Sequence, residues 1–511
     1  MRLFILLTTL LLSSISHAQL LTPIWTDDKT KLEGMYSKYF GVMDLIYHDE
    51  KMMYFYEWGG TNSELVKYDM KTSAFSEHDM KFQLNNSEIT ARNLVNTKKG
   101  AFLIFADEID RKAVIASSDL VNSPDKLTTM YEEATTYKNP FGLKGGGSTV
   151  MNTHVDKEED FNGIIQSQDS TKFAYIYGQG WLDQKDEKNV VNIIYFDENL
   201  KKSDVLKYES TVGDDRAIEL LNAILLNDGS TYLLFKFDGN IEKGNKSFCF
   251  KNKYGIIDFN DYYQIVHINK EKVIKRVDFV KNRFMVDVQI IPYIDGIGLF
   301  TIYSPTNNNW VTIPPTYKNG YMFVKNGSVE IDIDSDLPKI TYAIGMDFQK
   351  IFVENNENAV CFSERNYCHE DNLGSTSGSY KLECNSSEVT IYNFKKDGSV
   401  LFNTVIDKEF IDYRYDKYIG SSFFYYKDHY YIFYNDKKHA KEISKLGVNG
   451  EVKSCITKID LSGNIVGTYY VQNMKDALPI ATSESVYLGN GRIIIIGRGS
   501  KDYQIGYLDL P

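Results

Sequence analysis

One pattern recurs along this chain and limits what it can fold into: an apolar strand, a tight turn of Asp, Asn, Lys or Gly, and a second apolar or aromatic strand. It appears about eight times, for example as AILLNDGSTYLLFKF and SVYLGNGRIIIIG. A unit of this kind buries its apolar face only against neighbouring copies, so the pattern indicates a repeat architecture. One turn residue per copy follows the previous one by 50 to 72 residues: Asp49, Lys99, Asp169, Asp228, Asp295, Asn356, Asp428 and Asn490.

Each copy extends on both sides of its hairpin into four strands, a to d. In the first copy we expect strands near 40–47, 52–58, 64–69 and 74–81. The last copy supplies three strands and then stops at Pro511, whereas LLTPIWT at 20–26 has strand character and no partner nearby in sequence. Four-stranded meanders repeated around an axis form a β-propeller. The sequence therefore predicts an all-β propeller of about eight four-stranded blades, with the ring closed by the N-terminal strand. Seven blades is the alternative, because the copy at 340–405 is irregular.

In period and strand pattern, the chain resembles β-propeller repeat proteins over nearly its whole mature length. It is similar to the divergent exported propellers of Gram-negative bacteria. The WD dipeptide, the paired kelch glycines, the Asp-box and the YWTD repeat do not recur in it. The resemblance therefore implies a fold and carries over no site residues.

The first eighteen residues have the features of a signal peptide. Arg2 precedes the apolar run LFILLTTLLL, and Ser16-His17-Ala18 is a small-residue cleavage pattern. We expect cleavage before Gln19, so that residues 1–18 are a signal peptide and 19–511 a single propeller domain, exported to the periplasm or secreted. No later segment reaches the ~20 apolar residues that a membrane span needs, so no integral membrane segment is expected in the mature chain.

Composition excludes one class of partner and supports the fold. The chain has 57 basic and 69 acidic residues, and this acidic balance disfavours nucleic acid as a partner. Its 37 Tyr and 29 Phe suit pleated, half-buried strands. The glycine-rich segment 142–148 lacks the Gly-Lys-Ser/Thr ending of a phosphate loop, and Cys368-His369 lacks the paired C-x-x-C arms of a zinc module. We therefore expect no cofactor and no metal.

The five cysteines are an odd number, which leaves at least one thiol unpaired within an exported chain. Three of them, Cys361, Cys368 and Cys384, lie in one stretch, where a disulfide would staple a loop. The pairing we expect is Cys361 with Cys384.

Because successive strands of a meander reverse direction, the a–b and c–d connections lie on one face of the ring, here called the a–b face. The b–c and d–a connections lie on the other, the b–c face. The a–b and c–d turns are short in sequence, whereas most b–c connectors are long, near 179–188, 238–256, 303–318, 364–387 and 435–453. Long loops on a rigid scaffold usually carry binding or catalysis.

Aromatic residues gather in these long connectors and indicate a ligand surface on the b–c face, because exposed aromatic rings suit sugars, peptides and other flat faces. The alternative is that each Trp folds its own loop against the blade edge. The candidate ligand-binding residues are Trp58, Trp181, Trp310, Tyr303, Tyr317 and Tyr367.

Three functions are compatible with this pattern. The first is a binding or interaction protein whose ligand is a glycan, a peptide or an envelope protein. The second is a propeller enzyme that acts on polysaccharide or peptide, which needs convergent acids; the third is a structural subunit of a cell-envelope assembly. No catalytic residue can be assigned, but the acids placed on b–c connectors are Asp107, Glu108, Asp110, Glu364, Glu370 and Asp371.

Overall fold

The computed structural model describes most of the chain from Leu20 to Pro511. The residues that it describes are 20–25, 30–31, 43–49, 51–57, 63–72, 74–84, 87–89, 91–134, 163–179, 190–209, 218–237, 262–279, 284–304, 318–334, 348–354, 356–372, 380–412, 420–436, 453–471, 478–498 and 502–511. The signal-peptide prediction falls outside them.

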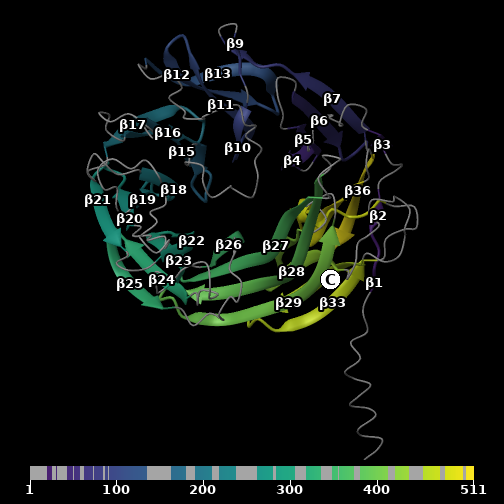
Figure 1. The fold of residues 1–511 in the computed structure, drawn as a ribbon. Coiled ribbons are helices and arrows are strands. Elements are labelled where there is room, and N and C mark those ends of the chain that lie inside the picture. The colour runs from purple at the N-terminus through teal and green to yellow at the C-terminus, as the bar shows by residue number, and fades with distance from the viewer. Residues whose placement is uncertain are drawn as a thin grey trace, which may run out of the picture.

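Eight antiparallel sheets follow one another around a ring (Figure 1). Blade 1 consists of β4(Met43–His48), β5(Met52–Glu57), β6(Ser63–Asp69) and β7(Ala74–Met80). Blade 2 consists of β10(Ala91–Thr97), β11(Gly100–Ile109), β12(Lys112–Asp119) and β13(Ser123–Ala134). Blade 3 consists of β14(Gly163–Gln166), β15(Lys172–Gln179), β16(Val190–Asp197) and β17(Lys202–Glu209). A small ladder of β8(Gln83–Leu84) and β9(Ser87–Glu88) lies between blades 1 and 2 in sequence.

Blades 4 to 6 repeat the same strand order. Blade 4 consists of β18(Ile218–Leu225), β19(Thr231–Phe237), β20(Tyr262–Ile268) and β21(Ile274–Phe279). Blade 5 consists of β22(Phe284–Tyr293), β23(Gly296–Ser304), β24(Lys318–Lys325) and β25(Ser328–Asp334). Blade 6 consists of β26(Phe348–Glu354), β27(Asn358–Asn372), β28(Tyr380–Lys395) and β29(Val400–Asp412). The irregular copy thus forms a complete blade 6 with unusually long strands, which decides for eight blades over seven.

The N-terminal segment closes the ring across two blades. Blade 7 contains β30(Ser422–Tyr426), β31(His429–Asp436), β32(Lys453–Asp460) and β33(Ile465–Val471), and β1(Leu20–Leu21) adds to it in parallel with β33. Blade 8 contains β34(Val486–Gly489), β35(Arg492–Arg498) and β36(Asp502–Asp509). Both β2(Ile24–Trp25) and β3(Thr30–Lys31) pair antiparallel with β36. The predicted closure by the N-terminal strand is confirmed.

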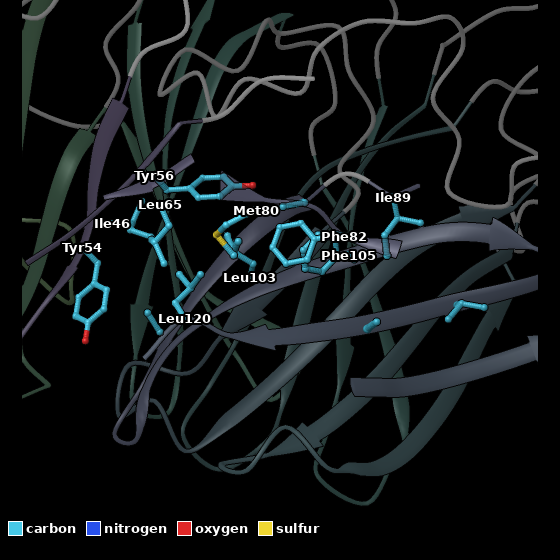
Figure 2. Packing of buried hydrophobic residues seen from close by; sticks show 14 of the residues in the cluster. Ile46, Tyr54, Tyr56, Leu65, Met80, Phe82, Ile89, Leu103, Phe105 and Leu120 are labelled. Atoms are coloured by element: carbon cyan, nitrogen blue, oxygen red, sulfur yellow. The ribbon is translucent and has the colours of Figure 1, made fainter. Parts of the chain in front are cut away.

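The apolar core is divided among the eight junctions between blades. Each of the eight clusters of buried residues combines side chains from two successive blades, and the last one joins blade 8 back to blade 1. Figure 2 shows the cluster between blades 1 and 2, where Phe82 and Phe105 pack with ring centroids 4.4 Å apart. Every blade is therefore stabilised mainly by its two neighbours.

This arrangement explains why the b strands are continuous apolar runs. In β15, Phe173, Tyr175 and Tyr177 pack toward blade 2. Ala174 and Ile176 alternate with them and pack toward blade 4. A strand that is buried on both faces has no polar side, so its sequence shows a run in place of alternation.

Helix is nearly absent from the described residues, whose one helical element is the 3-10 turn η2(Thr482–Glu484). None of the described helical segments is long and apolar enough to cross a membrane.

Blades 5 and 6 are joined on the a–b face through Asp295. Its carboxylate accepts hydrogen bonds from Lys396 and Asn356 of blade 6 and contacts Lys325 Nζ at 2.9 Å. Burial raises the pKa of Asp295, but these hydrogen bonds outweigh it and hold the pKa well below its usual range. A carboxyl with a depressed pKa stabilises the fold above its unfolded pKa and loses that contribution as pH falls through its folded pKa.

We expect Asp295→Asn to lower the free energy of unfolding by about 1–2 kcal/mol near neutral pH, because it removes hydrogen bonds between charged groups. The difference from the parent should shrink as pH falls below about 4, because the unfolded parent then takes up a proton while the folded carboxyl stays ionised, which lowers the stability of the parent. Urea unfolding across this pH range measures both effects. Glu330→Gln, on an exposed position of β25, is the control. A deficit that persists unchanged at low pH would contradict the assignment.

Candidate functional site: the b–c face

The strand bounds confirm that the two faces of the ring differ. On the a–b face no connection is longer than those at 167–171, 226–230 and 269–273. On the b–c face, connections run as long as 135–162, 238–261 and 437–452, and these three lie outside the described residues. Two b–c connections are short, at 110–111 and 499–501.

The acids of blade 2 lie in a tight hairpin, where Asp110 is in the b–c turn as expected, whereas Asp107 and Glu108 are on a strand and not on the connector. Asp107 and Glu108 lie within β11, opposite Val114 and Ala113 of β12. Asp110 and Arg111 form the whole turn, and both have positive φ, at 54° and 60°. Such a two-residue turn with left-handed backbone at both positions matches the twist of the flanking strands.

The acids of blade 6 are also on a strand and not on a connector. β27 and β28 remain paired from Asn358↔Lys395 to Asn372↔Tyr380, with one irregularity at Arg365/Asn366. Glu364 is buried opposite Val389. The positions of Glu370 and Asp371 are opposite Leu382 and Lys381, farther along the same hairpin. Blade 6 thus carries a two-stranded extension, residues 366–372 and 380–386, toward the b–c face. We call it the β27–β28 extension.

Two of the six candidate aromatics lie among the residues that the structure describes. Tyr303 and Tyr367 lie on β23 and β27, opposite Lys318 and Asn385. The other four, Trp58, Trp181, Trp310 and Tyr317, lie outside the described residues, in the connections after β5, β15 and β23. Their joint role as a ligand surface stays a prediction.

The expected disulfide between Cys361 and Cys384 is wrong. Cys361 is a buried free thiol, and burial raises its pKa. It lies opposite Tyr392, whereas Cys384 lies opposite Cys368, seven residues farther along β27. At ~3.3 Å per residue, this places Cys361 and Cys384 on the order of 20 Å apart, beyond the reach of a disulfide.

A cluster of polar residues, of which only Glu364 was named from the sequence, joins blades 6 and 7 on this face. Glu364 of β27 and Lys408 of β29 form an ion pair whose two side chains are 0% exposed. Ser421, immediately before β30, donates to the Glu364 carboxylate from its hydroxyl at 2.7 Å and from its backbone N–H at 3.0 Å. Ser386 Oγ lies 3.4 Å from the same carboxylate. Blade 6 thus supplies both charges, and blade 7 supplies their main neutral partner.

The role of this cluster depends on whether solvent and a substrate can reach it. Burial lowers the pKa of Lys408 against the opposing effect of Glu364, and Lys408 Nζ lies 3.1 Å from Ser421 Oγ. A serine beside a lysine of lowered pKa has the components of a nucleophile and a base. Both charged side chains, however, are closed to solvent, and a catalytic pair must be reached by its substrate. The cluster therefore acts as a junction between blades.

Polar contacts continue from this junction into blade 8. Thr482 Oγ1 donates to the Gly420 carbonyl at 2.6 Å, and Ser422 Oγ donates to the Thr482 carbonyl at 2.5 Å. Arg498, at the end of β35, contacts Glu484 at 2.5 Å, with each side chain 11% exposed. The b–c side of blades 6 to 8 is therefore held by ordered polar contacts between blades.

A comparable contact joins blades 2 and 3. Tyr131 of β13 donates to Glu133 at 2.6 Å, and Lys207 of β17 contacts the same carboxylate at 2.7 Å. Burial and the Glu133 carboxylate raise the pKa of Tyr131, so its hydroxyl stays protonated as a donor. Among the described residues, no group of three or more His, Cys, Asp or Glu side chains could hold a metal ion.

The chain is an eight-bladed β-propeller with one face of short turns and one of long connections. No protein-family model and no curated protein matches its sequence. Solved structures with a similar shape include an ulvan lyase of a new polysaccharide lyase family, at 8% identity and a TM-score of 0.39, over 90% of this chain and 96% of that one. The Dos1 propeller matches at 8% identity and 0.38, over 92% and 93%.

A prolyl oligopeptidase B from Galerina marginata, bound to a 35mer substrate, matches at 14% identity and a TM-score of 0.37 over 89% of this chain. The chain spans 54% of that protein. These similarities concern overall shape and carry no information on a ligand or a reaction.

Proposed function

We propose that this protein is an exported β-propeller that binds a glycan, a peptide or an envelope protein through its b–c face. Export rests on the leader-like residues 1–18. The observation that supports binding best is the difference between the two faces, because variable long segments on a rigid frame are the usual carriers of recognition.

The a–b face is built as a frame. Its turns contact one another across blades: the N–H of Asp169 donates to Asn227 at 3.1 Å, and the N–H of Ile294 donates to Asn356 at 2.6 Å. Such contacts occupy the backbone and side-chain groups of short turns and leave little adaptable surface. The b–c face carries the long connections and the β27–β28 extension, so it offers the greater freedom to fit a partner.

Aromatic residues in the b–c connections favour flat or ring-shaped ligand groups. Trp58, Trp181 and Trp310 belong to three different blades by the bounds of the flanking strands. Aromatic side chains supply large contact areas with few rotatable bonds, which makes them frequent anchors in binding sites. Because the three come from blades 1, 3 and 5, a ligand that contacts all of them would have to be extended.

The test screens the mature protein against glycan arrays, peptide arrays and purified envelope fractions, and then repeats any binding with Trp58→Ala, Trp181→Ala and Trp310→Ala. At least one variant is expected to weaken binding about tenfold or more, as loss of an aromatic anchor does. The matched control is Tyr425→Ala, because Tyr425 is 41% exposed at the a–b end of β30.

Two outcomes would count against the proposal. Binding that survives the triple Trp variant would place the ligand elsewhere, and an equal loss in Tyr425→Ala would move it to the a–b face. The same arrays read for cleavage test the enzyme alternative, because released sugars or peptides would show catalysis in place of simple binding. Isothermal titration calorimetry measures the changes in affinity.

A further inference from the structure

We propose that Cys368 and Cys384 form a disulfide that ties together the two strands of the β27–β28 extension. The proposal rests on the pairing of the backbone, which sets these two residues directly opposite each other. It goes beyond the proposed binding function and does not depend on the identity of any ligand.

The register gives both cysteines suitable positions. Residues directly opposite in an antiparallel pair have Cα atoms about 4.5–5.5 Å apart, whichever kind of pair they form. A disulfide needs Cα atoms about 4.4–6.8 Å apart. Opposite residues also share one face of the sheet. The ladder continues on both sides of this position, from Tyr367↔Asn385 to Asn372↔Tyr380, so the register is not an isolated contact at a frayed end.

The other cysteines of the described chain are poorly placed to compete. Cys361 is buried among the side chains that join blades 5 and 6, and Cys455 lies in the core between blades 6 and 7. Cys361 is a free thiol, and Cys455 is buried and not in a disulfide. Pairing Cys384 with Cys361 would require β28 to slip by seven residues along β27, which would unpair the blade.

Formation of this disulfide needs an oxidant, which the compartment that receives the protein would supply. The two thiols lose two protons and two electrons as the sulfur–sulfur bond forms. A disulfide-bearing oxidant, either a thiol oxidoreductase or oxidised glutathione, gains them and leaves as the dithiol or as two thiols. Oxidising compartments, to which exported proteins are delivered, support this reaction.

The bond would matter because it lies in the part of blade 6 that reaches beyond the core. The buried stretch of β27 includes Val360 and Phe362, packed against blade 7. Beyond the irregularity at Arg365/Asn366 the extension depends on its own ladder and on β29, which pairs as far as Cys384↔Asp412. Beyond that point only residues 369–372 and 380–383 pair, as a two-stranded ribbon, which is marginally stable by itself. A covalent link at its base would hold the two strands of this ribbon together.

Trypsin separates the cysteines, which makes the linkage easy to read. Cleavage after Lys and Arg puts each cysteine on a peptide of its own: 247–251, 351–365, 366–381, 382–395 and 454–458. The mature protein is alkylated under non-reducing denaturing conditions, digested and analysed by mass spectrometry. The expected species is peptide 366–381 joined to peptide 382–395, with Cys361 and Cys455 alkylated.

The experiment has two arms, so that a wrong assignment of export and a wrong pairing give different results. One arm isolates the protein after expression with its leader. The other arm reduces the purified protein and equilibrates it with oxidised glutathione. Linkage in the second arm supports the pairing whatever the compartment. Free Cys368 and Cys384 after this equilibration, or a link from either of them to another cysteine, would overturn it.

Variants test what the bond does. Cys368→Ser, Cys384→Ser and the double variant should be cleaved by trypsin at Lys381 several-fold faster than the oxidised parent, and at the rate of the reduced parent. Cys455→Ser is the matched control, because that cysteine is buried in another blade and is not in a disulfide. Equal cleavage rates in the oxidised parent and the double variant would show that the link does not hold the extension.

Discussion

Lys408→Met is expected to lower the free energy of unfolding by about 3–5 kcal/mol, because it leaves the Glu364 carboxylate buried without its cation. The carboxylate would keep the hydrogen bonds from Ser421 and lose its ion-pair partner at a position closed to water. Urea unfolding followed by circular dichroism measures the change. Lys207→Met is the matched control. Its ion pair with Glu133 is partly exposed, with side chains 48% and 35% accessible, so the loss should stay within about 1 kcal/mol.

The double variant Glu364→Gln/Lys408→Met separates the buried charge from the lost packing. It should be more stable than Lys408→Met alone, because a neutral amide costs less to bury than an unpaired carboxylate. A single variant as stable as the parent would show that the pair contributes nothing to the junction.

Removing residues 20–25 from the chain is expected to lower the free energy of unfolding of the whole ring by at least about 3 kcal/mol, because it exposes two apolar side chains and two sheet edges. Leu21 and Trp25 pack against the cluster between blades 7 and 8. Trp25 also lies over Gly506 and Gly497, where any larger side chain would meet its ring. Thermal unfolding monitored by circular dichroism should show one lowered transition, since each blade depends on its neighbours.

Point variants test the same closure without shortening the chain. Trp25→Ala should be clearly destabilising, whereas Ile24→Ala should have little effect because Ile24 is 59% exposed. Gly506→Val is a further test from the opposite strand, since a Cβ at this position would lie 2.6 Å from the Trp25 ring. If the shortened chain and Trp25→Ala both unfold at the parent temperature, the N-terminal strands do not secure the ring.

The fold was predictable because its main interactions are periodic. Strands such as β15 and β35 are buried on both faces, so their apolar runs stand out in the sequence, and tight turns with Asn or Asp mark where each hairpin reverses. The strands expected near 52–58 and 74–81 match β5 and β7 closely. The N-terminal strand was predictable by elimination, because the last copy lacked one strand.

The details of the b–c face were harder to predict from the sequence. Glu364 and Lys408 are 44 residues apart, and nothing local distinguishes them from the solvated charges of an acidic protein. The length of β27 and β28 was missed because polar residues such as Glu370 and Asp371 are typical of loops. The turn at Asp110-Arg111 has positive φ at both residues but no glycine, so a two-residue hairpin was not predicted there. These features depend on contacts between blades, and spacing along the chain does not reveal such contacts.

The positions of the closing strands also determine when the ring can close during folding. The partners of Ile24 and Trp25 are Tyr507 and Gly506, so these strands must wait for partners that are synthesised much later. Pairing between such distant segments carries a large entropic cost and forms slowly. Single blades can begin to form during synthesis, but the complete ring can arise only after β36 (Asp502–Asp509) has been synthesised. Ring closure is therefore a late step of folding, which follows the formation of single blades.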